Sequence, residues 1–507
     1  MTIINEHDFP PLPRTDAKQK EADEICRLRE QEPGTTLHDL PDELILEISE
    51  HLRRMERKLH RARTLLNFAL TSRRLYRIIT EMVYARFSNT YGEPYLFLRT
   101  MISNPQLARL VRDVDITIEY ETRAVGPHTP TAQDKKVIKE GLRALDIPYW
   151  KDCATDCYGS TEKDHGVMRN STILLFTPNV TSIRIECSYE YETPCPVWVA
   201  FISRAVMGRF GNAHGFERLR SITIVMSLTD VIAVSPLFHI QSLRTLQLHR
   251  VRECSEYDDQ LQPNYDEENI RKIQRLIPQA CNNLEELVVE NIFYTEDCLE
   301  ALIASSRRLK VFKTRAATSN LLPESRRLPT SKSKTVIGML GRHKTSLETL
   351  HVDRDDETDR DFPDKAHVRN NMKAFTSLKE LSCPLAAIMT GKKDRFVERL
   401  PPSLVTFRTH FRNRTCDLDW IGGLEHMLAN YEAHIPQLCE LRVETPYYSQ
   451  SEYKETVKRL ARPSAKAGIV FSHAIRHYEY WHDPEDTVSE SSESSDDVSM
   501  SSDEDRG

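Results

Sequence analysis

A frame of three apolar residues, spaced apolar-x-x-apolar-x-apolar, recurs along most of the chain. Apolar residues alternate with polar ones over its last three positions, which predicts a short β-strand with one buried face. The frames are Val111/Val114/Ile116, Val180/Ile183/Ile185, Leu219/Ile222/Ile224, Leu243/Leu246/Leu248, Leu284/Leu287/Val289, Leu309/Phe312/Thr314, Leu347/Leu350/Val352, Leu378/Leu381/Cys383, Leu404/Phe407/Thr409 and Leu438/Leu441/Val443. Gly468–Phe471 predicts one last strand after them.

Most frames follow a helical pattern and a polar turn. Ile270, Ile273 and Leu276 give such a pattern, and Asn282 and Asn283 give the turn before the next frame. A helix, a turn and a short strand resemble one unit of a leucine-rich repeat. From residue 180 the frames start 39, 24, 41, 25, 38, 31, 26 and 34 residues apart. The usual period is about 20–29 residues, so we expect irregular repeats with insertions in a solenoid whose parallel sheet lines the concave face.

A different pattern occupies residues 36–87. Pro41 suits a helix start, Asp42 and Glu43 complement the dipole of its first turn, and an apolar stripe at helical spacing follows. Thr64–Leu70 predicts a short second helix with Thr64 as its N-cap, and a third helix is expected from Ser72. Three short helices give a marginal core, and we expect their surplus apolar surface to need a partner.

Leu40-Pro41-x-Glu43-Leu44-Ile45-x-x-Ile48, followed by Leu65-Leu66-x-x-Ala69-Leu70-x-x-Arg73-Arg74, resembles the F-box. With the repeats, the chain resembles F-box proteins with degenerate leucine-rich repeats, as commonly found in fungi. This resemblance implies docking on a small Skp-type adaptor and, through it, on a cullin ubiquitin ligase. The adaptor contacts implied are Leu40, Pro41, Leu44, Ile45, Ile48, Leu52, Leu66 and Leu70.

The pattern departs from the family at three points. Ser72 and Leu75 stand where the family usually has a cysteine and an aromatic residue. The link from Arg53 to Arg63 is longer than usual and strongly basic, and we expect it to extend the first helix or form a loop without binding nucleic acid. The alternative is a helical cap that only seals the next domain.

The net charge and the cysteine content indicate which partners and which cellular compartment to expect. The net charge is −7, yet residues 483–507 contain ten acidic residues and one arginine, so the rest of the chain is near neutral. We therefore expect no general attraction to nucleic acid or membranes. Without an apolar leader or spanning segment, and with eleven scattered cysteines, we expect reduced thiols and a cytoplasmic or nuclear location.

Four segments are predicted. Residues 1–35 form a disordered N-terminal segment and 36–88 the F-box, and 89–482 form an α/β repeat solenoid. A helical insertion is expected between residues 120 and 170. Residues 483–507 form an acidic, serine-rich disordered tail. In this tail Ser494, Ser501 and Ser502 each have an acidic residue three positions later, which resembles acidophilic kinase sites.

Candidate chemistry is sparse. Cys153, Cys157 and His165, near Cys187 and Cys195, match no standard zinc spacing, and no catalytic motif or cofactor motif is found, so we expect neither metal nor cofactor. Solenoids often bind partners on the concave face, and alternation places polar residues of the later strands there. The substrate-contact residues predicted are His249, Glu286, Glu290, Lys313, Arg315, His351, Arg408 and Arg442.

The function expected is substrate recognition for an SCF-type cullin ubiquitin ligase, by a chain that is not itself an enzyme. Its repeats would hold a protein substrate close to a charged ubiquitin-conjugating enzyme. Opposite charges fall on neighbouring strands, with Glu286 and Glu290 beside Lys313 and Arg315, and Arg408 before Glu440 and Glu444. These groups can pair with each other or offer a mixed-charge surface to a partner. For Lys313, Arg315 and Arg408 we expect contact with an acidic or phosphorylated partner. The alternatives are a scaffold that uses the F-box without ubiquitin transfer, and an enzyme with an unrecognised site.

Overall fold

The computed structural model describes fourteen stretches of the chain, residues 37–53, 58–90, 92–118, 130–158, 167–187, 196–226, 229–251, 265–292, 296–316, 335–354, 372–389, 395–411, 421–446 and 457–476. The strands are β1 Arg86–Ser88, β2 Asp113–Ile118, β3 Ser182–Cys187, β4 Ser221–Met226, β5 Thr245–His249, β6 Glu286–Ile292, β7 Val311–Ala316, β8 Thr349–Arg354, β9 Glu380–Pro384, β10 Thr406–His410, β11 Glu440–Pro446 and β12 Val470–Arg476. The α-helices are α2 Asp42–Arg53, α3 Lys58–Leu70, α4 Arg73–Tyr84, α5 Pro94–Ser103, α6 Pro105–Ala108, α7 Ala132–Ala144, α8 Trp150–Tyr158, α9 Val167–Leu175, α10 Val197–Val206, α11 Val231–Val234, α12 Tyr265–Leu276, α13 Glu296–Ala304, α14 Val336–Met339, α15 Leu385–Ile388, α16 Ile421–His434 and α18 Ala461–Lys466. The 3-10 helices are η1 Leu37–Asp39, η2 Ser235–His239, η4 Leu340–His343 and η5 Phe396–Arg399.

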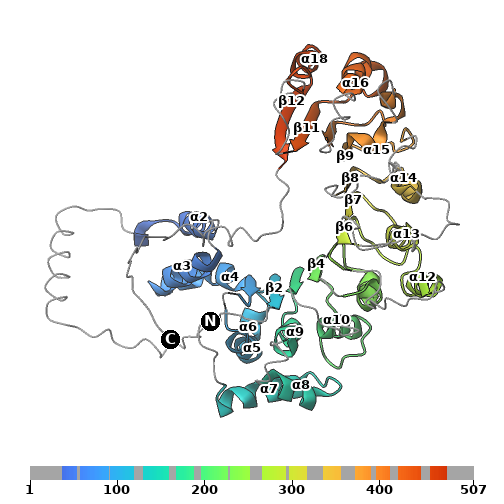
Figure 1. The fold of residues 1–507 in the computed structure, drawn as a ribbon. Helices are drawn as coiled ribbons and strands as arrows, with labels where there is room; N and C mark the ends of the chain where they lie inside the picture. The colour runs from blue at the N-terminus through green and yellow to red at the C-terminus, as the bar shows by residue number, and fades with distance from the viewer. Residues whose placement is uncertain are drawn as a thin grey trace, which may run out of the picture.

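The twelve strands form one parallel sheet in which every strand pairs with its neighbours in sequence order, from β1 to β12. Figure 1 shows the strands on the inner side of an open arc and α10, α12, α13 and α16 on its outer side. The sheet is not closed, so β1 and β12 are its edges. Each strand therefore makes its sheet hydrogen bonds to the strands that lie next to it in sequence order.

The apolar frames predicted from the sequence form three stacked columns. At the second column, Val114, Ile183 and Ile222 are strand-pair partners, and the same register continues to Phe471. Residues of the frames are buried in every unit, with Thr314 half-buried as the one exception. All ten frames are therefore confirmed as strands of the sheet. The final strand is also present, but it begins at Val470, two residues later than predicted, and runs to Arg476.

Two segments near the N-terminus differ from the prediction. The second helix begins at Lys58, so Thr64 lies inside α3 and is not its N-cap, and half of the basic link belongs to this helix. β1 was not predicted, because Arg86-Phe87-Ser88 carries one apolar residue and no frame. The boundary expected at residue 88 would separate β1 from the sheet to which it belongs.

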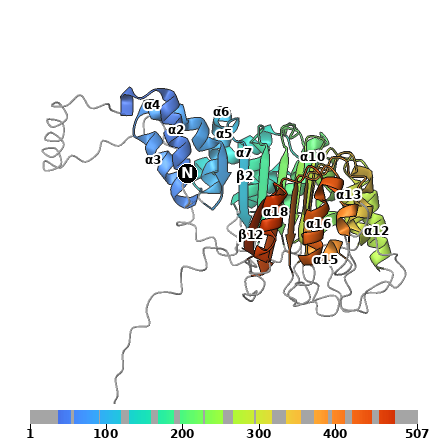
Figure 2. The same ribbon diagram turned by 90° about the horizontal axis from the view of Figure 1, so that it is seen from above.

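No spacer separates the N-terminal helices from the sheet. α4 ends at Tyr84, and Ala85, whose carbonyl accepts from the Arg112 and Asp113 amides at 2.7 and 3.0 Å, leads directly into β1. Phe87 stacks on Phe97 of α5 with ring centroids 4.2 Å apart. Figure 2 shows α2, α3 and α4 beside α5 and α6 at the β2 end of the sheet.

The helical insertion expected between β2 and β3 is present as α7, α8 and α9. A capping box starts α7, in which Thr131 and Asp134 exchange hydrogen bonds, and the buried Asp134 carboxylate also lies 2.7 Å from the Arg99 guanidinium. Among the described residues, we find no helix with the length and apolar character needed to cross a bilayer.

Candidate functional site

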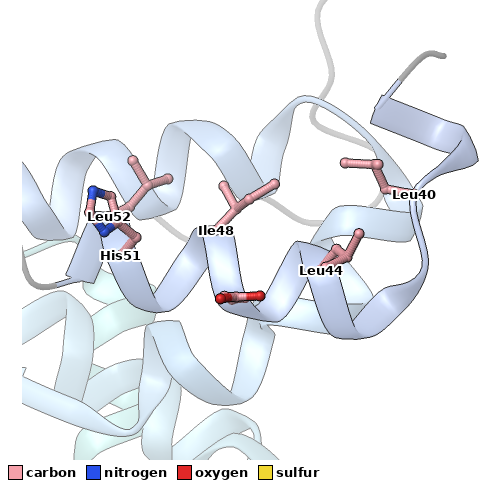
Figure 3. Close-up of a pocket in the computed structure, with 6 residues that line it drawn as sticks. Leu40, Leu44, Ile48, His51 and Leu52 are labelled. Atoms are coloured by element: carbon pink, nitrogen blue, oxygen red, sulfur yellow. The ribbon is translucent and has the colours of Figure 1, made fainter.

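The exposed apolar surface of α2 forms an open pocket of about 500 Å³. It is lined by Leu40, Leu44, Glu47, Ile48, His51 and Leu52, which we call the docking face. Leu44, Ile48 and Leu52 follow at intervals of four residues and therefore lie on one side of the helix. Figure 3 shows these side chains along α2, with Leu40 contributed by the segment just before it. Leu44 keeps 44% of its surface exposed, and it adjoins other apolar residues in this pocket, so the exposed surface is a patch rather than one isolated leucine.

The opposite side of α2 packs into a small core of Ile45, Ala69, Leu75 and Ile79, one or two residues from each helix. Arg74 of α4 fixes the segment before α2. Its guanidinium donates to the Leu40 carbonyl at 2.7 Å and lies 2.6 Å from the Asp42 carboxylate. The core therefore uses one side of each helix and leaves the docking face without a partner in this chain's described residues.

Ser72 and Leu75, which replace the family's usual cysteine and aromatic residue, both have a structural role in the three-helix unit. The Ser72 hydroxyl accepts a hydrogen bond from the Leu75 amide at 3.1 Å and caps α4. Leu75 is 3% exposed and fills the core. The serine therefore serves as an N-cap, which cysteine does poorly, and the leucine supplies the apolar volume.

The residues predicted to contact the adaptor fall into three groups. Leu40, Leu44, Ile48 and Leu52 line the docking face, and Pro41 is exposed beside it. Leu66 and Leu70 are half-buried on α3 and do not line this pocket. Ile45 is fully buried in the core, so its inclusion in the contact set is corrected. Glu47 and His51 were missed, although their positions next to Ile48 and Leu52 could have indicated them.

Residues 37–84 match the F-box domain family. The chain contains an F-box domain. The match begins at η1, includes α2, α3 and α4, and ends where α4 ends. An F-box domain implies binding to the adaptor of SCF-type ubiquitin ligases, and F-box proteins are generally non-catalytic substrate receptors. A comparison of the chain with curated proteins finds no match.

The inner wall is the second candidate surface, formed by side chains at the first, third and fifth register positions of β5–β11. Its charged members are His249, Glu286, Glu290, Lys313, Arg315, His351, Asp353, Glu380, Arg408, His410, Glu440, Arg442 and Glu444. All eight residues predicted to contact a substrate are among them. Glu380 was missed, although the same alternation rule places it before Leu381.

The cations of the wall already have partners within it. Lys313 lies 3.5 Å from Glu286, and Arg315 lies 3.8 Å from Asp353. Arg408 was expected near Glu440 and Glu444, but the carboxylate it meets is Glu380, at 3.4 Å on β9. Six carboxylates face four lysines and arginines, so the wall has no cationic excess when its histidines are neutral.

Arg408 and Arg442 are direct register partners on β10 and β11. Because two like charges repel, each arginine pairs with a different carboxylate. The Arg442 Nε lies 2.9 Å from Glu444 on its own strand. Strand alternation places Val288 and His410 on this wall, but both are buried, with 4% and 7% of their surface exposed.

Burial and pairing shift two ionisable groups on the wall. The His249 side chain, whose Nδ1 lies 3.2 Å from Glu290, lowers the pKa of that carboxyl, and Arg315 adds to the effect. Burial lowers the pKa of His351, even though its Nε2 lies 3.1 Å from Glu380. At neutral pH the wall therefore contains an ionised Glu290 and a neutral His351.

The thiol cluster shows no sign of metal coordination in the described stretches. Cys153 and Cys157 lie on α8 and Cys187 lies on β3, all buried, and burial raises the pKa of Cys157 to about 12. Its Sγ lies 3.4 Å from the Thr172 hydroxyl. His165 and Cys195 lie outside the described residues. Within the described part of the chain, no group of three or more His, Cys, Asp or Glu is placed to hold a metal ion.

Proposed function

We propose that this chain is the substrate-recognition subunit of an SCF-type cullin ubiquitin ligase. Its F-box docks a Skp-type adaptor, and its strand row, which we interpret as irregular leucine-rich repeats, holds a protein substrate on the inner wall. The observation that carries the proposal is the F-box match at residues 37–84, in which three leucines and one isoleucine predicted to contact the adaptor line one open apolar pocket. The complex would act in the cytoplasm or nucleus.

The docking face has the properties of a protein-binding surface. Leu44, Ile48 and Leu52 present apolar surface, while Glu47 and His51 supply polar groups at the rim. Burying exposed apolar surface contributes about 25 cal/mol per Å², so a few leucine-sized contacts supply several kcal/mol. An interface with an apolar centre and a polar rim is the usual arrangement for stable complexes.

For the inner wall we propose a protein partner of mixed charge. The sequence favoured an acidic or phosphorylated partner over pairing within the wall, because Lys313, Arg315 and Arg408 are cations that such a partner could meet. Each of them now has a carboxylate within 4 Å, which removes that preference. A partner that offers both signs could exchange with these pairs, and such complementarity would set specificity more than affinity.

The test of adaptor docking compares two leucines on the same helix. Leu44 lines the pocket and is 44% exposed, while Leu46 lies outside it and is 40% exposed. Replacing Leu44 and Ile48 by Ala should weaken adaptor binding about tenfold or more, because two apolar contacts are lost. Leu46→Ala is the matched control and should bind normally. Isothermal titration with a purified Skp-type adaptor measures both.

Equal adaptor binding by the double variant and the control would place docking elsewhere. Adaptor binding without cullin recruitment would instead favour the scaffold alternative. For the wall, changing Lys313, Arg315 and Arg408 to Glu should abolish substrate capture, measured by crosslinking and mass spectrometry of the intact complex. Capture that survives, in a protein with unchanged melting and adaptor binding, would move the substrate site off the inner wall.

A further inference from the structure

A second charged surface lies at the rim of the sheet, on the residues that directly precede β4–β9. These rim residues are Arg220, Arg244, Glu285, Lys310, Glu348 and Lys379. Each is stacked on the next by a backbone hydrogen bond, as from the Lys310 amide to the Glu285 carbonyl at 2.8 Å. Parallel strands lie about 4.8 Å apart, so neighbouring side chains along this rim interact.

The rim is hollowed beside Lys310 into a pocket of about 280 Å³, which we call the rim pocket. It is lined by Arg244, Asn283, Glu285, Arg307, Arg308 and Lys310. Four cations and one carboxylate therefore meet there, an excess of three positive charges. The inner wall has the opposite balance, so the positive surface expected on the wall lies at the rim instead.

Two of these arginines are held in place by the backbone. Arg244 donates to the Gln241 and Leu243 carbonyls, both at 2.8 Å. Arg307 donates to the Ala280 carbonyl at 3.0 Å and to the Asn283 side chain at 3.2 Å. Fixed guanidinium groups bind an anion without a large loss of side-chain entropy, and their planar donor sets suit phosphate oxygens.

The other two cations differ in their partners. The Lys310 ammonium lies 2.6 Å from the Glu285 carboxylate, which leaves one cation of the pocket neutralised. Arg308 is exposed and makes no hydrogen bond or ion pair with any part of the chain that the structure describes. Its charge still reaches along the rim, because Arg308 and Lys310, after the closer Lys379, help to lower the pKa of Glu348.

We propose that the rim pocket binds a phosphoserine side chain within an acidic segment, and that the chain's own residues 489–505 supply it. Ser494, Ser501 and Ser502 each have an acidic residue three positions later. A kinase would transfer the γ-phosphoryl group of ATP to the serine oxygen, releasing ADP and a proton. The resulting dianion presents three oxygens to the arginines, and the flanking carboxylates complement Arg220 and Lys379.

The length of chain permits this contact. Lys310 and β12 are five strand intervals apart, about 24 Å along the sheet, and the seven residues of β12 add about 23 Å from one rim to the other. The 25 residues from Arg476 to Ser501 span up to about 80 Å when extended. The tail can therefore reach the pocket of its own molecule.

The experiment measures binding of a labelled synthetic peptide of residues 489–505, phosphorylated at Ser501 and Ser502, to the unphosphorylated full chain by fluorescence anisotropy. The unphosphorylated peptide should bind at least about tenfold more weakly, because charged hydrogen bonds to the phosphate are lost. Arg308→Ala should cause a loss of similar size, and it disturbs no contact that holds the fold.

A pair of charge-matched variants locates the site. Arg307→Glu with Arg308→Glu changes the net charge by the same amount as Lys313→Glu with Arg408→Glu on the inner wall. The rim variant should lose the phosphopeptide and keep the protein substrate, and the wall variant should do the reverse. Melting curves show whether each variant is still folded. If the charge reversal at Arg307 unfolds the chain, Arg307→Gln replaces it in the experiment.

Three results would overturn the proposal. Phosphopeptide binding that survives Arg308→Ala and Arg307→Gln would show that the rim pocket is not the site. Equal binding of an unrelated phosphoserine peptide with neutral flanks would remove the assignment to the tail, as would displacement by inorganic phosphate at the peptide's own concentration. Loss of adaptor or substrate binding would test the proposed function alone, since the rim pocket shares no residue with either surface.

Discussion

Replacing Phe87 by Ala is expected to loosen the F-box and the first strands together. Phe87 is 3% exposed and stacks on Phe97 at the point where α4 continues into β1. Removing a buried phenylalanine costs about 3–5 kcal/mol. In a row where each strand contacts only its neighbours, this loss should remain local.

Hydrogen–deuterium exchange followed by mass spectrometry measures this effect. A loss of about 3–5 kcal/mol corresponds to roughly 10²- to 10⁴-fold faster exchange in the strongly protected amides of α4, β1 and β2. Phe396→Ala is the matched control, because Phe396 is 1% exposed and packs near Phe407, far along the sheet. Its effect should appear in β9, β10 and α16. Faster exchange in α4 with the control, or unchanged exchange there with Phe87→Ala, would refute the local coupling described.

Three further predictions concern stability. Ile45→Ala should lower the free energy of unfolding of the F-box helices by about 2–5 kcal/mol, measured by denaturant titration, because Ile45 is fully buried in a four-residue core. Gly211→Ala should cost at least about 2 kcal/mol in the same assay, because φ is +57° and an added Cβ would clash with the Leu145 carbonyl oxygen. The melting temperature should fall as pH drops below 6.5, because burial lowers the pKa of His343 and protons then bind the unfolded chain in preference. The His343→Gln variant should show a smaller fall, and an identical pH slope would contradict this assignment.

The strand row could be predicted from the sequence because each apolar frame places its residues against those of the neighbouring frames. If one strand were shifted by a single residue, its frame leucines would point to the exposed face of the sheet. Leu246 and Leu381 are instead fully buried. Insertions of varied length did not obscure the pattern, since α7–α9 lie between frames rather than within them. The pattern of buried apolar residues within each frame can therefore be recognised even when the distance between frames varies.

The candidate sites were harder to predict, because they depend on the direction in which each individual side chain points. Ile45 and Leu44 are adjacent in sequence, and only the helix rotation of about 100° per residue decides that one is core and the other docking surface. Arg408 has acidic residues on both neighbouring strands, and its choice of Glu380 follows from side-chain geometry. The rim pocket was missed because its residues precede the strands and follow no alternation rule.

In the proposed ligase, the direct passage from α4 into β1 would set the orientation in which a bound substrate meets the rest of the complex. Only Ala85 lies between the end of α4 at Tyr84 and the start of β1 at Arg86. One residue inserted in α4 would rotate the adaptor by about 100° around the helix axis relative to the inner wall, whereas a four-residue insertion would nearly restore its angle and shift it by about 6 Å. In the proposed ligase, activity would therefore depend on the helical phase of α4, and insertions of one to four residues should change ubiquitin transfer in a periodic rather than a progressive way.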